Sequence, residues 1–516
     1  MKIIIPMAGS SGSFIDEGLG LKPLAMIDGK TMIERVCGMF PKGSSFIFLC
    51  RKEDLEQGLE IELKKISPSA KIVAVAKPTR GVAETVMLAD GHAGEDEEII
   101  IHHADSFAVW DFGEFLAKAR EADGALSVFS GFSPAAYTHS LYGLAKTESG
   151  FVKEIVEKQP FAVSADSGYT AAGSYYFRSW RIFRKYAERM MGKNINAGGI
   201  FYDSLVFNEM ISDGLRVIPY IVEDFVSWGE PVNVKEYLFW SGYFASLVGY
   251  EDTRKTHDMT DLIPAAGKGK RFADAGYKTP KPLINVLGKE MILQSALSLP
   301  KARKYVFVIL KEQSDSYGLD KLLKQGIHGC EVVVIDRMTD GMARTCLMAE
   351  KLLDKSKPVL ISSCDYSFVY NDEKFEKLVE KEKPDAIIWT FREYPDARLA
   401  PKAYGYLVVE NGAVKKISEK VPISEQPHRD HIVQGVFWFR TADLFLWAAK
   451  RMIEKGRAIN GEYYVATAIN EMLEEGMKVL PFEVDKYICW GTPLDMKTFE
   501  YWQEYFSRDA EHSYWK

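Results

Sequence analysis

The chain has 516 residues, of which 47% are hydrophobic and 27% charged, and its formal net charge is −7. This composition is ordinary for a globular protein of roughly two to four domains, and it lacks the basic excess of a nucleic-acid-binding protein. Apolar runs such as residues 305–310 are far shorter than the roughly 18 residues that span a membrane, and the strand-like N-terminus is not the pattern of a signal peptide. We therefore expect a cytoplasmic protein with no nucleic-acid partner and no membrane-inserted segment.

The sequence resembles itself at an offset of about half its length. Residues 5–9 (IPMAG) recur as 263–267 (IPAAG) at an offset of 258, and Trp228-Gly229 recurs as Trp490-Gly491 at 262. A repeat of this size is a whole domain and not a solenoid unit of about 20–50 residues. We expect two tandem domains, residues 1–250 and 258–516, joined within residues 249–260. The joint is short, which predicts contact between the repeats; an oligomer also remains open.

Within each repeat, short β-branched runs alternate with helical patterns. In the second repeat we expect strands at residues 261–264, 305–310, 331–335 and 358–362, and helices near 291–299, 320–325 and 343–353. This alternation predicts an α/β, Rossmann-like domain with a mostly parallel central sheet flanked by helices. Ligands of such sheets bind beyond the carboxyl ends of the strands.

The later part of each repeat has a different pattern. Residues 404–409 and 414–418 flank Asn411-Gly412, which predicts a β-hairpin and a smaller substrate-binding subregion. Each repeat ends in an aromatic helix, and the spacing of the rings favours a buried helix face over a cofactor site. These rings are Tyr237, Trp240 and Phe244 in the first repeat and Phe499, Trp502 and Phe506 in the second.

A glycine- and lysine-rich loop follows the first strand of the second repeat. It reads Ala265-Ala266-Gly267-Lys268-Gly269-Lys270-Arg271, and residues 280–283 (PKPL) come after it. Glycines let backbone N–H groups approach phosphate oxygens, and Lys268, Lys270, Arg271 and Lys281 bring four cations. The loop therefore predicts polyphosphate binding, although it is neither a G-x-G-x-x-G fingerprint nor a P-loop. A surface turn is the alternative, which the strand before the loop and PKPL after it disfavour.

These motifs resemble the sugar-nucleotide pyrophosphorylase, or nucleotidyltransferase-A, family. The family pattern is a strand followed by A-G-x-G-x-R, then P-K-P-L, then a helix that starts with G-K-x-[ML]-[IL]. The last of these motifs lies at residues 288–292 (GKEMI) in this chain. The resemblance implies two tandem nucleotidyltransferase domains. It also implies a reaction in which a substrate phosphate attacks the α-phosphorus of an NTP and pyrophosphate leaves, without a covalent intermediate.

The resemblance also implies roles for individual residues. Arg271, Lys281 and Asp365 would be catalytic, and Asp365 would hold Mg²⁺. The family usually places a second metal-binding aspartate where this chain has Trp490, so Asp485 is a substitute, with an ordinary strand-end aspartate as the equal alternative. The implied nucleotide-binding residues are Ala265, Ala266, Gly267, Lys268, Gly269, Lys270 and Gly341, and the implied substrate-binding residues are Gly405, Glu419, Lys420 and Gly435. Taken singly, each would be a turn, cap, packing or solvated residue.

The first repeat has lost most of the loop chemistry. The second glycine position is Ser11, the arginine position is Ser13, and both loop lysines are absent, whereas Lys22 and Asp105 remain. We expect the second repeat to be catalytic and the first to be a degenerate copy with a structural, regulatory or substrate-binding role.

Two other classes of function remain open. One is a nucleotide-sugar-dependent glycosyltransferase, which commonly uses Asp-x-Asp; the corresponding residues here are Asp365-Tyr366-Ser367. The other is a non-catalytic regulator that binds nucleotides or sugar nucleotides. Neither the base of the NTP nor the phosphorylated acceptor follows from the sequence. By analogy with the family, the product would be an activated building block for a cell-surface polysaccharide.

Overall fold

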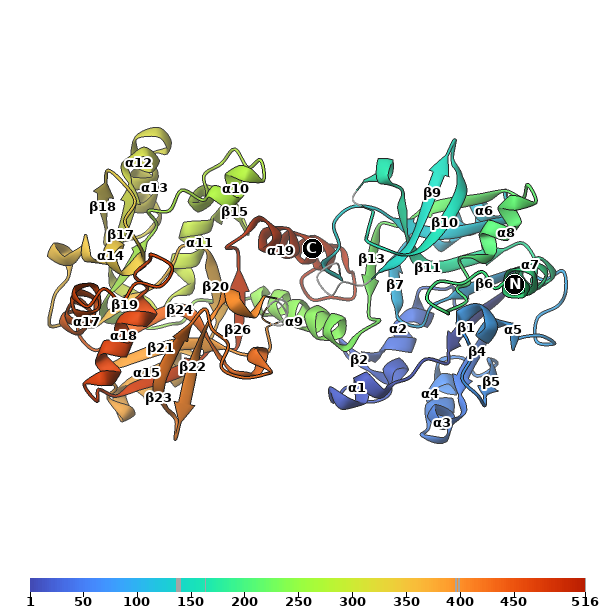
Figure 1. Cartoon of the computed structure of the whole chain (residues 1–516), viewed down its shortest axis with the longest axis horizontal. Coiled ribbons are helices and arrows are strands. Elements are labelled where there is room, and N and C mark those ends of the chain that lie inside the picture. The colour runs from blue at the N-terminus through green and yellow to red at the C-terminus, as the bar shows by residue number, and fades with distance from the viewer. Residues whose placement is uncertain (136–140, 163, 395–396, 398–399, 516) are drawn as a thin grey trace. The chain divides into compact units, whose positions relative to one another are not determined.

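A computed structural model describes residues 1–135, 141–162, 164–394, 397 and 400–515 (Figure 1). The chain divides into two compact units, Met1–Gly242 with Glu504–Lys516, and Tyr243–Gln503. The expected ranges, 1–250 and 258–516, differ from these mainly at the C-terminus, whose last residues lie with the first unit. The units change within helix α9 (Pro231–Leu247), ahead of the predicted joint. Among the described residues, no helix is long and apolar enough to cross a membrane.

The second unit has a nine-stranded sheet whose main path runs β18-β17-β14-β19-β24-β21-β25. Most neighbours are parallel, and β24 is antiparallel to both of its neighbours. The mostly parallel α/β sheet expected from the sequence is confirmed. The strands on this path are β14 (His257–Pro264), β17 (Ala302–Leu310), β18 (Cys330–Ile335), β19 (Val359–Ile361), β21 (Ala386–Phe391), β24 (His431–Phe439) and β25 (Val479–Glu483).

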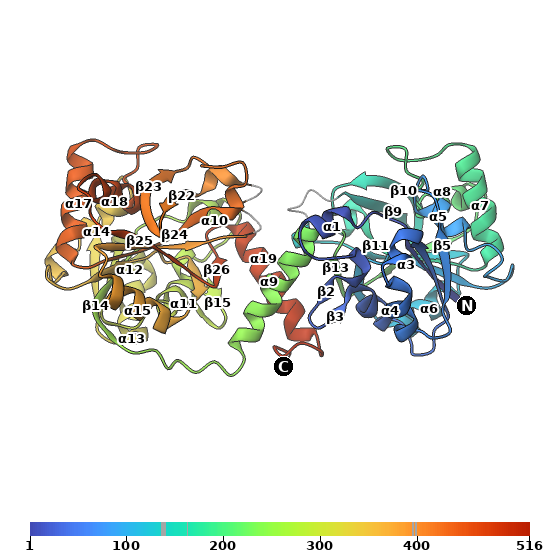
Figure 2. The same cartoon turned by 90° about the horizontal axis from the view of Figure 1, so that it is seen from below.

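Helices cover the sheet because its strands are apolar on both faces. Val306, Phe307, Val308 and Ile309 of β17 are all fully buried, as expected for a central parallel strand. Helices α17 and α18 lie side by side in both views and join the core beneath them (Figures 1 and 2). The helices of this unit are α10 (Lys270–Asp274), α11 (Met291–Ser298), α12 (Lys311–Tyr317), α13 (Leu319–Gly326), α14 (Met342–Leu347), α15 (Asp372–Glu382), α17 (Ala442–Glu454), α18 (Val465–Glu474) and α19 (Pro493–Arg508), which continues into the first unit.

Two antiparallel strand pairs accompany these strands: one belongs to the nine-stranded sheet, and the other is a separate two-stranded sheet. The predicted hairpin is confirmed as β22 (Gly405–Glu410) and β23 (Ala413–Glu419), with Asn411 and Gly412 at φ 50° and 75°. A two-residue turn of this kind needs positive φ at both positions. The other pair is β20 (Tyr366–Val369) with β26 (Lys486–Cys489), which begins directly after Asp365.

The first unit repeats this architecture, with a nine-stranded sheet whose main path runs β10-β9-β11-β6-β1-β4-β5. Its strands are β1 (Lys2–Met7), β4 (Phe46–Arg51), β5 (Lys71–Val75), β6 (Ile99–His102), β8 (Gly124–Phe129), β9 (Tyr142–Glu148), β10 (Phe151–Gln159), β11 (Tyr169–Phe177) and β12 (Val217–Ile221), with β7 (Ser106–Val109) paired to β13 (Asp224–Ser227). Its helices are α1 (Gly12–Asp16), α2 (Met32–Gly38), α3 (Lys52–Glu56), α4 (Leu59–Ile66), α5 (Val82–Met87), α6 (Phe112–Ala119), α7 (Trp180–Gly192), α8 (Val206–Ser212) and most of α9.

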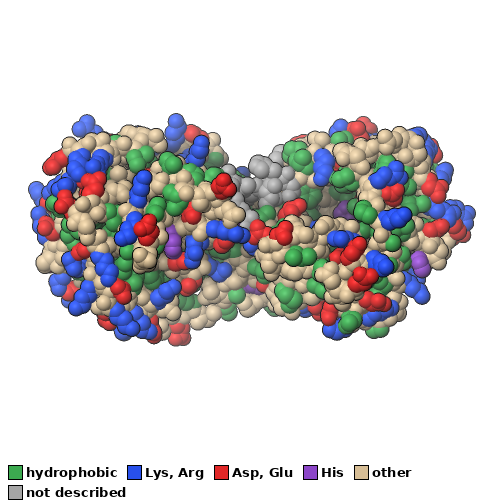
Figure 3. Space-filling view, turned by 60° about the horizontal axis from the view of Figure 1, so that its bottom comes forward, with side chains coloured by type: hydrophobic (Ala, Val, Ile, Leu, Met, Phe, Trp, Pro, Cys, Tyr) green, Lys and Arg blue, Asp and Glu red, His purple; other side chains and the backbone are tan. Residues whose placement is uncertain are grey.

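The aromatic helices α9 and α19 bury their rings, as predicted. Tyr237, Trp240 and Phe244 are each at most 4% exposed, and so are Phe499, Trp502 and Phe506. Across the face of the molecule drawn in Figure 3, cationic and anionic side chains are interspersed.

Candidate active site

The glycine loop leaves the carboxyl end of β14 and lies directly against Lys281. Gly269 has φ +59°, and a β-carbon there would come within 2.8 Å of the Lys281 β-carbon. Only glycine fits this close approach without strain. The Gln313 side chain of α12 holds the loop from below, because its Nε2 donates to the carbonyls of Ala265 (3.1 Å) and Gly267 (3.2 Å). Gln313 was not predicted from the sequence.

A cavity of about 240 Å³ opens beside this loop. Its lining includes Gly267, Lys268, Gly269, Lys281 and Gln313. Ala265 and Ala266 are buried beneath the loop. The structure thus brings the predicted nucleotide-binding loop and Lys281 to one hollow at the carboxyl end of the sheet.

Three cations of the loop have no anionic partner. Lys268, Lys270 and Arg271 are exposed, and within the described part of the chain none of them lies within ion-pair distance of a carboxylate. Each could therefore contact an anionic ligand without first breaking an ion pair. Arginine and lysine at a glycine-rich turn suit the oxygens of a polyphosphate.

Lys281 and Asp365 form a largely buried ion pair at the strand ends. Lys281 Nζ bonds Asp365 Oδ2 and also donates to the Gly491 carbonyl at 3.0 Å, and Ser363 Oγ donates to Asp365 Oδ1 at 2.6 Å. Burial opposes ionisation of Asp365, but the Lys281 ammonium outweighs burial and lowers the pKa of the carboxyl. Burial likewise opposes charging of Lys281, and Asp365 raises its pKa. Both groups are therefore charged at neutral pH.

The second carboxylate near Asp365 is Asp495, not Asp485. In the β20–β26 register, Tyr366 pairs with Cys489 and Val369 with Lys486, so Asp485 lies about five residues along the ribbon from Asp365, roughly 16 Å. That separation contradicts the prediction that Asp485 shares an ion with Asp365. A β-carbon on Gly491, by contrast, would lie 3.6 Å from Asp365 Oδ2 and 3.7 Å from Asp495 Oδ2.

Asp495 also lies in the first turn of α19 and bonds the residue that caps this helix, Thr492, which explains why its sequence context does not mark it as a site residue. Its Oδ2 accepts from the Thr492 N–H (2.7 Å), and its own N–H donates to Thr492 Oγ1 (3.2 Å). Burial raises the pKa of Asp495, and the charge of Asp365 adds to that shift. The two carboxylates on either side of Gly491 offer the hard oxygen donors that Mg²⁺ prefers, so the types of residue present fit this ion.

Four further predicted residues lie in or beside the hairpin and in the neighbouring strand β24. Gly405 makes room for the Glu419 carboxylate, because a β-carbon there would lie 2.6 Å from Glu419 Oε2. This Oε2 is buried and has no hydrogen-bond partner among the described residues, and burial raises the pKa of Glu419. Lys420 Nζ donates to the Ala403 carbonyl. Gly435 (φ +104°) makes room for the Tyr366 ring.

The need for glycine at position 341 has a structural explanation, and the same explanation holds for the corresponding residue of the first repeat, Gly81. The φ of Gly341 is +131°, and a β-carbon would lie 2.6 Å from the Tyr463 carbonyl oxygen. In the first repeat, Gly81 meets the Phe201 carbonyl in the same way, at 2.5 Å. The glycine therefore lets two backbone segments pack, and its contact with a base stays a prediction.

The first unit keeps the central ion pair and loses the surroundings. Lys22 Nζ contacts Asp105 Oδ2 (2.6 Å) and the Gly229 carbonyl (2.8 Å), as Lys281 does in the second unit. At the Gly269 position, however, Ser11 is buried and its Oγ accepts from the Lys22 N–H at 3.1 Å. Ser11 thus bonds the loop of the first unit, which carries no cation, to the backbone of Lys22.

In the first unit, the acidic side chains near Asp105 already have protein partners. Glu157 Oε1 accepts from Ser204, where the second unit has Ala466. His103 Nε2 contacts both carboxylate oxygens of Asp203, at 3.3 and 3.1 Å. Burial opposes protonation of His103, but Asp203 outweighs burial and raises the pKa of the imidazole to about 9.

The His103–Asp203 pair predicts a pH-dependent stability of the first unit. A folded pKa of about 9 lies above the unfolded value of about 6.5, so the stabilisation, roughly 3 kcal/mol, is complete below pH 6.5 and is lost as pH rises toward 9. We expect the thermal midpoint of wild type to exceed that of His103→Gln clearly at pH 6 and little at pH 9.5. A difference that does not shrink with pH would contradict the pairing.

Comparison with known proteins assigns the chain to a family. The nucleotidyl transferase family model matches residues 22–201 and 260–515, so the chain belongs to that family and carries it twice. Two bifunctional GlmU proteins are similar: 24% identity over 224 residues in Fervidobacterium nodosum and 25% over 227 in Aliarcobacter butzleri. These matches cover 43% and 44% of this chain and 45% and 48% of the relatives, so the chain spans about half the length of the curated relatives it matches.

Solved structures give further matches. The nucleoside-diphosphate-sugar pyrophosphorylase from Vibrio cholerae is 21% identical, with 46% of this chain and 98% of that chain covered and a TM-score of 0.38. The inositol-1-phosphate CTP transferase from T. maritima is 16% identical, with 49% and 96% covered and a TM-score of 0.38.

Proposed function

We propose that the second unit transfers a nucleotidyl group from an NTP to a small phosphorylated substrate, such as a sugar 1-phosphate. A phosphate oxygen of the substrate attacks the α-phosphorus, the bond to the β-phosphate breaks, and pyrophosphate leaves, giving an NDP-activated product. The observation that carries this proposal is the loop beside the Lys281–Asp365 pair, whose three cations have no carboxylate partner in the described part of the chain. Family membership supports it.

The residues present suit such a reaction, which needs positioning and charge neutralisation more than covalent chemistry. Arg271 and the loop lysines would hold the leaving pyrophosphate, and Lys281 would bridge the phosphates of the two substrates. Asp365, with Asp495 across Gly491, would hold Mg²⁺, which would supply further neutralisation of phosphate charge. The product would be an activated precursor, by family analogy for a cell-surface polysaccharide.

We assign the activity to the second unit and not to the first. The first loop lacks the cations, and where the second unit has Gly269 in close contact with Lys281, the first has Ser11, whose Oγ accepts from the Lys22 N–H. The family model, moreover, matches the first repeat only from residue 22, after this loop.

The proposal is tested by incubating the chain with each NTP, Mg²⁺ and a panel of sugar 1-phosphates and phosphorylated alcohols. We expect pyrophosphate in equal amount to an NDP-linked product for one pair of substrates. Nucleotide binding without turnover would instead favour a regulator. Transfer of sugar from an NDP-sugar, with release of NDP, would favour a glycosyltransferase.

Glu419 is expected to select the phosphorylated substrate. Its Oε2 is enclosed and has no hydrogen-bond partner within the described residues, and the other oxygen of the carboxylate, Oε1, can accept a substrate hydroxyl, a charge-assisted bond worth about 1.5–3 kcal/mol. Glu419→Gln should raise KM for that substrate about 10- to 100-fold and leave KM for the NTP unchanged. Glu157→Gln is the matched control, because Ser204 already bonds Glu157. Equal changes in both KM values would contradict this role.

A further inference from the structure

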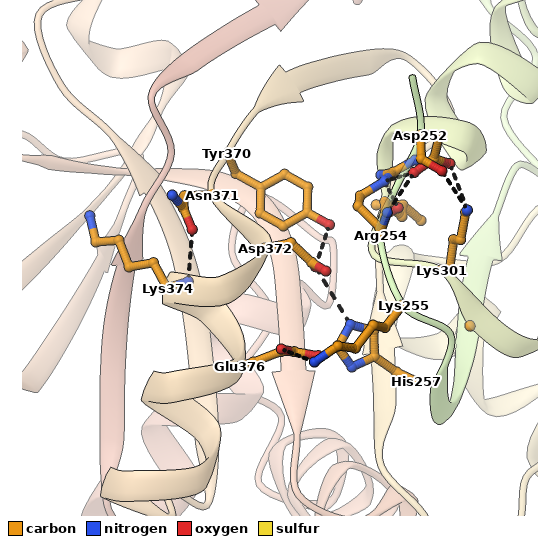
Figure 4. Close-up of polar contacts among 12 residues, drawn as sticks. Asp252, Arg254, Lys255, His257, Lys301, Tyr370, Asn371, Asp372, Lys374 and Glu376 are labelled. Carbon is orange, nitrogen blue, oxygen red and sulfur yellow. Dashed lines mark hydrogen bonds and ion pairs between the residues drawn. The ribbon is translucent and has the colours of Figure 1, made fainter. Parts of the chain in front are cut away.

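Three potential metal ligands meet at the end of β14 farthest from the glycine loop. His257 is the first residue of β14, and Asp372 and Glu376 lie one turn apart on α15 (Figure 4). One ligand atom from each lies within 4.8 Å of the other two. Their side chains are only 18%, 17% and 22% exposed. The cluster is thus preformed, partly buried and distinct from the proposed active site.

The geometry between the imidazole and the first carboxylate suits a metal better than a hydrogen bond. His257 Nε2 lies 3.5 Å from Asp372 Oδ1, beyond the range of about 2.7–3.2 Å for an N–H···O bond. Nε2 is also buried without a hydrogen-bond partner among the described residues. Two donors held by a tetrahedral zinc ion at about 2.1 Å each would lie about 3.4 Å apart. The observed distance of 3.5 Å between His257 Nε2 and Asp372 Oδ1 is close to this donor–donor distance.

The neighbouring groups are placed as supporting contacts. The Tyr370 hydroxyl donates to Asp372 Oδ1 at 3.1 Å, the kind of outer hydrogen bond that orients a ligating carboxylate. Lys255 Nζ lies 3.3 Å from Glu376 Oε2, and its side chain is 78% exposed (Figure 4). Lys255 can therefore move into solvent when a cation enters, leaving two carboxylates to balance the charge of that ion.

The first repeat lacks this cluster. Helices α6 and α15 begin at corresponding residues, because Asp111 and Asn371 cap them in the same manner. Counted from these caps, Asp372 corresponds to Phe112 and Glu376 to Leu116. The three ligands are therefore a feature of the second unit and not of the duplicated domain.

We propose that His257, Asp372 and Glu376 bind one Zn²⁺, with water as the fourth ligand. The ion ties the start of β14 and the irregular residues before it to α15. Because zinc would bind the folded unit and not the unfolded chain, it stabilises the second unit by mass action. Imidazole nitrogen among the donors favours zinc over Mg²⁺, which prefers oxygen ligands.

The test uses the full chain after a chelator has removed bound metal. Calorimetric titration with Zn²⁺ in the presence of a competing chelator then measures the stoichiometry and affinity of zinc binding. His257→Gln should lose one zinc equivalent relative to wild type, and Glu376→Gln should bind that equivalent at least about tenfold more weakly. The matched control is His328→Ala, an exposed histidine of the same unit, which should keep it. Substituted Co²⁺ should show the visible absorption of a four-coordinate ion in wild type and His328→Ala and not in His257→Gln.

Thermal denaturation provides the second readout. Zinc should raise the midpoint of wild type and His328→Ala and leave His257→Gln unchanged. Equal zinc stoichiometry and affinity in wild type and His257→Gln would overturn the proposal, as would loss of the same equivalent in His328→Ala. Lys281→Met should still bind this zinc equivalent, so the outcome is independent of the proposed catalysis.

Discussion

Replacing Lys281 by methionine is expected to lower kcat/KM for pyrophosphate release by about 10²- to 10³-fold. The variant keeps the length and apolar stem of the side chain but removes the ammonium that faces Asp365 and the proposed phosphates. Removal of one preorganised charge that stabilises the transition state costs about that much in other enzymes. Initial rates of pyrophosphate release at varied NTP and substrate concentrations measure the loss.

The matched control is Lys22→Met, in the equivalent ion pair of the first unit. Lys281 and Lys22 have similar side-chain exposure, 16% and 25%, so breaking either pair should destabilise its own unit to a similar degree, about 3–5 kcal/mol. Only the first variant should lose activity at temperatures where both are folded. Equal losses of activity from the two variants would contradict a single catalytic unit.

Replacing Gly269 by serine, the residue at the corresponding position 11, is expected to lower kcat/KM for the NTP about 100-fold. The β-carbon would lie 2.8 Å from the Lys281 β-carbon, at a φ of +59° that side chains rarely adopt. The loop must therefore shift away from Lys281, separating its cations from the ion pair. NTP-dependence of pyrophosphate release measures the effect.

The reciprocal variant, Ser11→Gly, serves as the control for Gly269→Ser. It frees the first loop, but that loop still carries no lysine or arginine between residues 9 and 14, so neither activity nor nucleotide binding should appear in the first unit. Unchanged NTP kinetics in Gly269→Ser would show that the close approach of the loop to Lys281 has no part in nucleotide binding.

Much of the fold was predictable because the duplication doubles each signal. The strands expected at 305–310 and 331–335 correspond to β17 (Ala302–Leu310) and β18 (Cys330–Ile335). The first is a continuous apolar run because β17 is buried, whereas β18 is a half-exposed edge strand whose run of valines favours a strand. The helix expected at 343–353 is shorter, as α14 (Met342–Leu347) and a separate 3₁₀ turn, Glu350–Leu352. The sequence does not reveal that residues 504–516 belong to the first unit. The aromatic rings of α19 predict that this helix is buried, but they do not predict which residues bury it.

The loop and its cations were readable from sequence, whereas groups assembled by tertiary structure were not. Asp495 has the sequence position of a first-turn aspartate that bonds the N-cap residue, and it does bond Thr492 in this way. The contrast between a bonded Glu157 and an unpartnered Glu419 depends on residue 204 being serine and residue 466 alanine, about 47 residues further along the chain. The register of β20 with β26, which separates Asp485 from Asp365, likewise exists only in the fold.

The central claim is that the second unit alone joins an NTP to a phosphate monoester. The most direct measurement follows an NTP labelled at the α-phosphate, with the acceptor found by the substrate panel, in wild type and in Lys281→Met/Asp365→Asn, whose first unit is intact. The account predicts that wild type releases pyrophosphate and transfers an equal amount of label to the acceptor, and that the double variant does neither. Pyrophosphate release undiminished in the double variant, or label leaving as free nucleoside monophosphate, would contradict it.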